Sequence, residues 1–132
     1  MTVRVARCRC GQLTAICRGE PVRVSVCHCI DCQRRTGGPF SAQARFPREA
    51  VTIAGTSRIW EQVGGSGRRA CFHWCDTCGG TVFWINQGAE ETVAVPIGTF
   101  AEGDVPVPTV SIFEERRQPW VRIEGEGITH LA

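Results

Sequence analysis

Hydrophobic and polar residues alternate with a period of two along most of the chain. This period is typical of β-strands, in which successive side chains point to opposite faces of a sheet. It predicts short strands bounded by glycine and proline turns at residues 13–17, 22–26, 41–46, 51–53, 58–61, 69–74, 81–85, 91–97, 110–113 and 120–123, the last two as edge strands. The run Gly64-Gly65-Ser66-Gly67 predicts a hairpin loop. A mainly β fold is expected.

Helix is predicted in one place only. Residues 31–36 can form a helical turn, because Gly37-Gly38-Pro39 follows and would end it. A chain of 132 residues is expected to form a single domain over residues 1–132.

Charge excludes some classes of partner. The formal net charge is +2, and acidic and basic residues are interspersed, so we expect neither nucleic-acid binding nor attraction to a membrane surface. No apolar run approaches the roughly twenty residues of a membrane span, and residues 1–7 contain no apolar secretion signal. The expected location is cytoplasmic.

Nine cysteines are many for a chain of this length. They could form a disulfide scaffold outside the cell or thiolate metal sites inside it. The odd count, the absence of a secretion signal and the C-x-C and C-x-x-C spacings favour metal binding. Zinc is the expected ion, because thiolate is a preferred ligand of Zn²⁺.

Two cysteine pairs, Cys8/Cys10 and Cys75/Cys78, are each followed directly by glycine. A zinc knuckle turns its backbone toward the metal so that N–H groups point at sulfur, and glycine tolerates the positive φ that this turn requires. We expect these four cysteines to form one structural zinc site that contributes to folding. The alternative is a set of buried free thiols.

Cys27, Cys29 and Cys32 form a different motif, with no glycine after them. Three thiolates on Zn²⁺ leave a net charge of −1, which makes the ion a poor acidifier of water. An open fourth position would better suit a thiol, which can bind as thiolate. The following residues, Arg34 and Arg35, could offset the negative charge or hold a substrate carboxylate, and Arg68 or Arg69 on the glycine loop could assist.

This second site has a structural alternative. A fourth ligand could complete it, and the candidates are Cys71, His28, His73 and Asp31. Otherwise Cys17 and Cys71 are expected to be small buried hydrophobes, and His28 and His73 to be structural. Phe72, Trp74, Phe83 and Trp84 are expected mostly in the core, and His130 in a frayed tail without a role.

The three cysteine motifs resemble, in order and spacing, those of the glutathione-dependent formaldehyde-activating enzyme family. The matching segments are residues 8–11, 27–37 and 72–79, and residues 95–100 and 117–120 are also similar. The resemblance implies a β-tent of short antiparallel sheets held by two zinc ions. In its pattern Cys8, Cys10, Cys75 and Cys78 match the structural zinc ligands, and Cys27, Cys29 and Cys32 match the catalytic ones.

This sequence departs from the family pattern at two positions. Trp74 stands where phenylalanine is common, and Gln33 stands where arginine often follows the third cysteine. Neither is a metal ligand.

The family's type activity is the condensation of formaldehyde with glutathione to S-(hydroxymethyl)glutathione, a carbon–sulfur lyase reaction. The leading hypothesis is therefore a zinc-dependent lyase that joins glutathione or a related small thiol to a small aldehyde. The alternative is a non-catalytic, zinc-stabilised binding or carrier module with the same fold.

Overall fold

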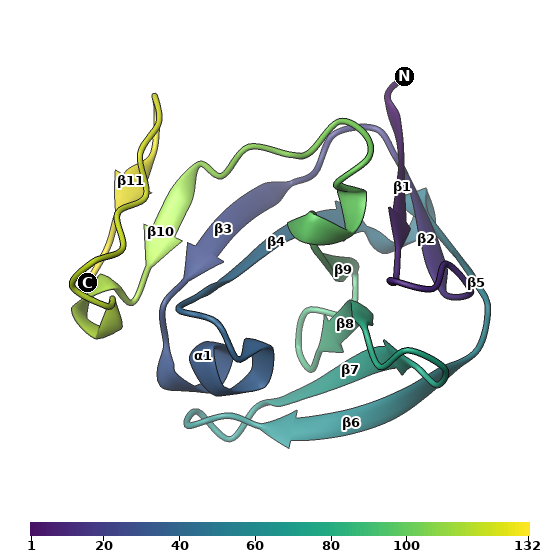
Figure 1. The fold of residues 1–132 in the computed structure, drawn as a ribbon, viewed down its shortest axis with the longest axis horizontal. Helices are drawn as coiled ribbons and strands as arrows, with labels where there is room; N and C mark the ends of the chain where they lie inside the picture. Colours follow the sequence, from purple (N-terminus) through teal and green to yellow (C-terminus); the bar gives the residue numbers. More distant parts are fainter.

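The computed structural model describes residues 1–132 and is mainly β, as predicted. Three strands form a small antiparallel sheet in the order β1-β2-β5: β1 (Val3–Arg7), β2 (Thr14–Arg18) and β5 (Val51–Ala54). In Figure 1 this sheet lies at the opposite side of the molecule from the C-terminal strands.

The other eight strands form one sheet in the order β11-β10-β3-β4-β9-β8-β7-β6. Its members along the chain are β3 (Arg23–Cys27), β4 (Ser41–Pro47), β6 (Ser57–Val63), β7 (Arg69–Cys75), β8 (Thr81–Asn86), β9 (Thr92–Pro96), β10 (Val110–Ile112) and β11 (Thr129–His130). The sheet is not purely antiparallel, because β10 runs parallel to both β3 and β11. It curves so that the β6–β7 hairpin lies across from β3 and β4 (Figure 1).

The predicted helical turn is present as α1 (Ile30–Thr36). The side chain of Cys29 caps its first turn by accepting a hydrogen bond from the Cys32 N–H, and Gly37 ends it with φ +71°. Three short 3₁₀ turns, η1 (Arg48–Ala50), η2 (Ile97–Phe100) and η3 (Glu114–Arg116), complete the regular structure. None of the helices is long and apolar enough to cross a bilayer.

The main core lies between the two sheets. Its largest fully buried side chains include Leu13, Phe46, Val82 and Phe100, and the rings of Phe46 and Phe100 meet edge to face at 6.1 Å. This core joins β2, β4, β8 and η2, so it holds the small sheet against the large one.

The prediction of a strand at residues 120–123 is wrong. The backbone there is held in a turn instead, since the Val121 N–H donates to the Gln118 carbonyl and the Arg117 guanidinium donates to the Val121 carbonyl. The last strand is β11, further along the chain.

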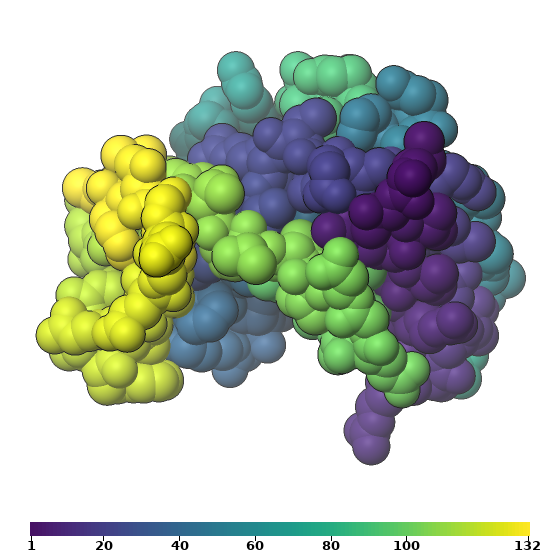
Figure 2. Space-filling view, turned by 90° about the horizontal axis from the view of Figure 1, so that it is seen from above, coloured from purple at the N-terminus to yellow at the C-terminus, as the bar shows by residue number.

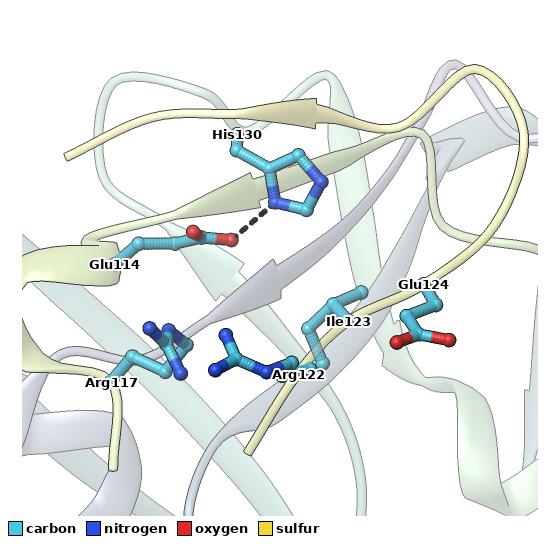
Figure 3. Close-up of a pocket in the computed structure, with 6 residues that line it drawn as sticks. All are labelled: Glu114, Arg117, Arg122, Ile123, Glu124 and His130. Carbon is cyan, nitrogen blue, oxygen red and sulfur yellow. Dashed lines mark hydrogen bonds and ion pairs between the residues drawn. The ribbon is translucent and has the colours of Figure 1, made fainter. Parts of the chain in front are cut away.

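The prediction that His130 lies in a frayed tail is also wrong. This residue lies in β11 beside β10, and its Nδ1 is 2.6 Å from Glu114 Oε2. Figure 3 shows this pair above the side chains of Arg117 and Arg122, in a surface pocket that Ile123 and Glu124 also line.

Strand β1 was not predicted, because its inward face carries a charge. The buried positions of β1 are Arg4 and Ala6, whereas Val3 is exposed. Arg4 donates from Nε to the Asp104 carbonyl at 3.0 Å and forms ion pairs with Asp104 and Glu20. These bonds tie β1 to the segment after η2, which crosses between the N-terminal and C-terminal ends of the molecule (Figure 2).

Candidate metal centres and the adjoining pocket

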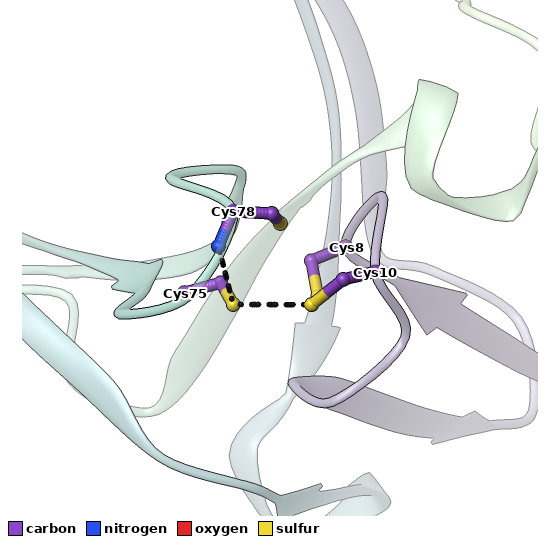
Figure 4. A group of neighbouring side chains, drawn as sticks. All are labelled: Cys8, Cys10, Cys75 and Cys78. Atoms are coloured by element: carbon purple, nitrogen blue, oxygen red, sulfur yellow. Dashed lines mark hydrogen bonds between the residues drawn. The ribbon is translucent and has the colours of Figure 1, made fainter.

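The first cysteine cluster joins the two sheets. Cys8 and Cys10 follow β1, Cys75 ends β7, and Cys78 lies in the turn before β8 (Figure 4). All four sulfur atoms lie within 4.8 Å of one another, with Cys8 to Cys10 at 3.7 Å and Cys10 to Cys75 at 3.6 Å. A tetrahedral zinc with Zn–S bonds of about 2.3 Å requires sulfur atoms about 3.8 Å apart. The cluster can therefore hold a metal ion of this kind.

Backbone N–H groups converge on these sulfur atoms. The Leu13 N–H donates to Cys8 Sγ, and those of Thr77 and Cys78 donate to Cys75 Sγ, each at 3.3 Å. The predicted glycine geometry is also present, since φ is +83° at Gly11 and +81° at Gly79. Such bonds orient thiolate ligands and stabilise their charge.

The same donors act on the acidity of Cys75. Burial by itself raises the pKa of this thiol, but the N–H groups of Cys78 and Thr77 and the amide of Gln12, at 3.0 Å, outweigh it and lower the pKa to about 6. These donors favour the thiolate form of Cys75, which is the form that binds metal.

The second cluster consists of Cys27, Cys29 and Cys32. Cys27 ends β3, Cys29 caps α1, and Cys32 lies in the first turn of that helix. Their sulfur atoms also lie within 4.8 Å of one another. The tight turn between β3 and α1 thus brings three thiols together within six residues.

No fourth ligand atom joins this cluster. His28 is fully buried, and its Nε2 lies 2.9 Å from Ser111 Oγ. His73 binds Ser57 through Nδ1 at 3.0 Å and stacks on Phe83, while Asp31 does not belong to the group. Cys71 lines a different pocket together with His73. Three protein ligands and a free side are the arrangement found at catalytic zinc.

The free side faces a pocket of about 180 Å³ that is open to solvent. Residues of β3, β4, β6, β7, β8, β10 and α1 line the pocket, and the full lining consists of Arg23, Ser25, Cys27, Cys29, Asp31, Cys32, Arg35, Ser41, Gln43, Arg45, Gln62, Phe72, Trp84 and Ile112.

The two arginines predicted as substrate ligands differ in position. The guanidinium carbon of Arg35 lies 4.6 Å from the ring centres of both Phe72 and Trp84, inside the pocket. Arg34 is exposed and does not line the pocket. Arg69 pairs with Glu61 and lines the other pocket, and Arg68 also lies outside the thiol pocket.

Arg35 and the thiols influence one another. Burial lowers the pKa of Arg35, and the negative charge of Cys32 opposes this shift. In turn, a hydrogen bond from Cys27 lowers the pKa of Cys32 to about 5, with Ser41 and Arg35 among the further causes, although burial acts in the opposite direction. The same bond, together with burial, raises the pKa of Cys27. Arg35 thus offsets the negative charge of the cluster.

Several pocket residues were missed from the sequence. Arg23 and Arg45 lie on the paired strands β3 and β4. Phe72 and Trp84 are buried, as expected for core residues, and they also line the pocket. The sequence contained one indication of Arg23: residues 23, 25 and 27 are spaced two apart, so their side chains lie on the same face of β3. Knowing that this face borders the pocket required the pairing register of the strands.

The two residues that depart from the family pattern, Gln33 and Trp74, lie in different environments. Gln33 donates from Nε2 to the carbonyls of His28, at 2.8 Å, and Arg116, at 3.0 Å. Its Oε1 accepts from Gln118 at 2.7 Å. Gln33 therefore anchors the three-cysteine loop to η3. Trp74 lies half-buried in β7 and does not line the thiol pocket.

Fold and clusters together define a mainly β protein with two thiol clusters capable of metal binding, one joining its sheets and one opening into a pocket. The family model for the glutathione-dependent formaldehyde-activating enzyme matches residues 3–116. The chain belongs to this family.

A similar fold occurs in the crystal structure of a Rhodobacter sphaeroides protein. The TM-score is 0.55 at 20% sequence identity, and the match covers 77% of this chain and 91% of that one. No curated protein matches the sequence.

Proposed function

We propose that the chain is a zinc-dependent thiol-adduct enzyme of the carbon–sulfur lyase type, acting on glutathione or a related small thiol and formaldehyde or another small aldehyde. The observation that carries the proposal is the cluster of Cys27, Cys29 and Cys32, which has no fourth protein ligand and faces a cationic, aromatic pocket. Family membership supports the same substrates.

The proposed reaction forms one bond. The thiol sulfur attacks the aldehyde carbon, a carbon–sulfur bond forms, and the thiol proton is transferred in net terms to the carbonyl oxygen; the lyase direction reverses these changes. Zinc bound by the three cysteines would supply a stabilised substrate thiolate at neutral pH. No oxidant or reductant is needed.

The chain's own residues would position the thiol. Arg35 places its positive charge beside the cluster, and Phe72 and Trp84 hold its guanidinium group by cation–π contact. This arrangement offsets the negative charge of the thiolates while leaving the free side of the cluster open to the pocket. The four-cysteine cluster would bind a second zinc with a purely structural role.

The test combines metal content with a spectroscopic response to thiol. We expect two metal ions per chain, and after cobalt substitution we expect glutathione to change the thiolate-to-metal absorption of one ion only. C29S should abolish that response, whereas C17S, which alters a buried cysteine outside both clusters, should retain it. NMR with ¹³C-formaldehyde should show accelerated formation of the hydroxymethyl thioether.

A different result would favour the other hypothesis. Two metals that are both indifferent to thiols would identify a zinc-stabilised binding module. A spectral response without faster adduct formation would identify a carrier of the thiol or its adduct.

A further inference from the structure

The floor of the thiol pocket is built from two paired strands. On β3 the side chains of residues 23, 25 and 27 share one face, and on β4 those of residues 41, 43 and 45 face the same pocket. The register places Cys27 opposite Ser41, Ser25 opposite Gln43, and Arg23 opposite Arg45. The floor thus runs from a thiol end to an end with two positive charges.

The middle of the floor is polar and its hydrogen bonds are satisfied internally. Ser41 Oγ donates to Gln43 Oε1 at 2.8 Å, and Gln43 Nε2 donates to Ser25 Oγ at 3.1 Å. All three side chains are buried. Because these groups bind one another, the floor has a fixed shape that keeps its two ends apart.

The charged end has no such internal network; Arg23 is exposed to solvent and Arg45 is half-buried. Arg23 and Arg45 are direct cross-strand neighbours, and neither forms an ion pair with a carboxylate. With its amide oriented to accept, Asn86 bonds Arg45 Nη1 and Nη2 at 3.1 and 3.3 Å, but this partner is neutral. Like charges directly opposite in a sheet are destabilising, and arginine cannot relieve the repulsion by losing its proton.

An anion between the two guanidinium groups would remove this repulsion, and a carboxylate fits them because arginine binds it through two parallel hydrogen bonds. The distance to the thiol end limits which carboxylate this can be. Four residues of strand span about 13 Å between the Cα atoms of positions 23 and 27, and the arginine side chains shorten that gap. An extended tripeptide is about 10 Å long and can reach from one end to the other. Cysteine, a single residue, is too short to do so.

We infer that Arg23 and Arg45 form the carboxylate-binding end of the thiol site and select a peptide-sized thiol acid over cysteine or 2-mercaptoethanol. This inference rests on the proposed function, since it assumes that the thiol sulfur binds at the three-cysteine cluster. The remaining guanidinium, that of Arg35, serves the cluster itself.

The experiment measures binding of three probes by titration calorimetry: reduced glutathione, its diethyl ester, which lacks both free carboxylates, and 2-mercaptoethanol. The proteins are the metal-loaded wild type, R23Q, R45Q, the double variant and R58Q. Arg58 is an exposed arginine on β6 outside the pocket, so R58Q matches the loss of one charge. Metal content of each variant is measured alongside.

We expect each pocket substitution to weaken glutathione binding by about tenfold, as for the loss of one charge-assisted hydrogen-bonding group. Binding of the diethyl ester and of 2-mercaptoethanol should not change, and R58Q should behave as wild type. Without ligand, R23Q should melt at a higher temperature than wild type, because it removes a repulsion. A purely structural arginine would give the opposite shift.

The outcomes separate the two proposals. If glutathione binds the wild type and the double variant equally, the inference is overturned and the proposed function stands. If the variants lose all three probes together with metal, the arginines are structural and the inference is again overturned. If no thiol binds the wild type, the proposed function fails and the inference fails with it.

Discussion

The sulfur atoms of Cys10 and Cys75 lie 3.6 Å apart although 65 residues separate them in the chain. Cys10 follows β1 of the small sheet, whereas Cys75 ends β7 of the large one. A metal bound here would close a long loop and join the two sheets, so its binding free energy would stabilise the folded chain directly.

Substitution of Cys75 is therefore expected to destabilise the protein strongly. C75S removes a buried ligand that accepts three hydrogen bonds, and we expect the loss of one metal ion and a fall in melting temperature of roughly 10 °C or more. Thermal unfolding and metal analysis check this. The control is C17S, which should keep both metals; a C75S protein with wild-type stability would contradict a structural role for this cluster.

Substitution of Cys29 is expected to act differently. The cluster of Cys27, Cys29 and Cys32 lies within one strand-to-helix turn, so a metal there closes only a short loop and contributes less to folding. C29S should lose one metal while its melting temperature changes by only a few degrees, about 1 kcal/mol. Global unfolding of C29S would show that this cluster is structural as well.

Gly55 is expected to tolerate no side chain. Its φ is +99°, and a Cβ atom there would lie 2.0 Å from the carbonyl oxygen of Gln12. Gln12 also donates to Cys75 Sγ, and Leu13 donates to Cys8 Sγ, so displacement of this backbone would disturb the four-cysteine cluster. We expect G55A to lower the free energy of unfolding by about 3 kcal/mol or more.

The matched control for this change is G88A. Gly88 has a similar φ of +85°, but a Cβ atom there would meet nothing within 4 Å. G88A should therefore show the backbone strain alone, about 1 kcal/mol. Urea unfolding of both variants measures the difference, and equal losses would show that the contact with Gln12 is not the cause.

Acid stability should depend on Glu114. Hydrogen bonds from Ser111 and His130 lower its pKa below the ordinary value of 4.5. A carboxyl with a lowered pKa contributes stability that is fully present above the ordinary pKa and is lost as the pH falls through the folded-state pKa. E114Q should thus be less stable than wild type at pH 7, and the gap should close on acidification below pH 4.5.

Urea unfolding at several pH values measures this gap. The control E115Q alters an exposed neighbour that forms no side-chain hydrogen bond, and it should follow the wild-type curve. Because acid also protonates the thiol ligands of every variant, only the difference between curves is informative. A gap that stays constant down to low pH would contradict the assigned role of Glu114.

The local pattern predicted most of the secondary structure. Alternation located nine of the eleven strands, and the glycine and proline after residue 36 located the end of α1. Strand β1 was missed because its buried face carries Arg4, whose charge is balanced by Asp104, about a hundred residues away. The strand expected at residues 120–123 failed because Arg117 and Gln118 bind its backbone in a turn.

The cysteine motifs of both clusters could be recognised in the sequence alone, although the fold brings Cys8 and Cys10 together with Cys75 and Cys78. Metal ligands in such motifs lie two or three residues apart, and the glycines after Cys10 and Cys78 mark the backbone conformation that the knuckles need. These are short-range constraints, so they can be recognised without knowing the fold.

The pocket beside the second cluster was decided only by the tertiary structure. The contact of Arg35 with Phe72 and Trp84, and the cross-strand pair Arg23 and Arg45, depend on which strands are neighbours and in which register they pair. A shift of one residue in that register would turn the arginines to the opposite face. A ligand motif within one chain segment can thus be recognised in the sequence, whereas the pocket residues opposite it depend on how the strands pair.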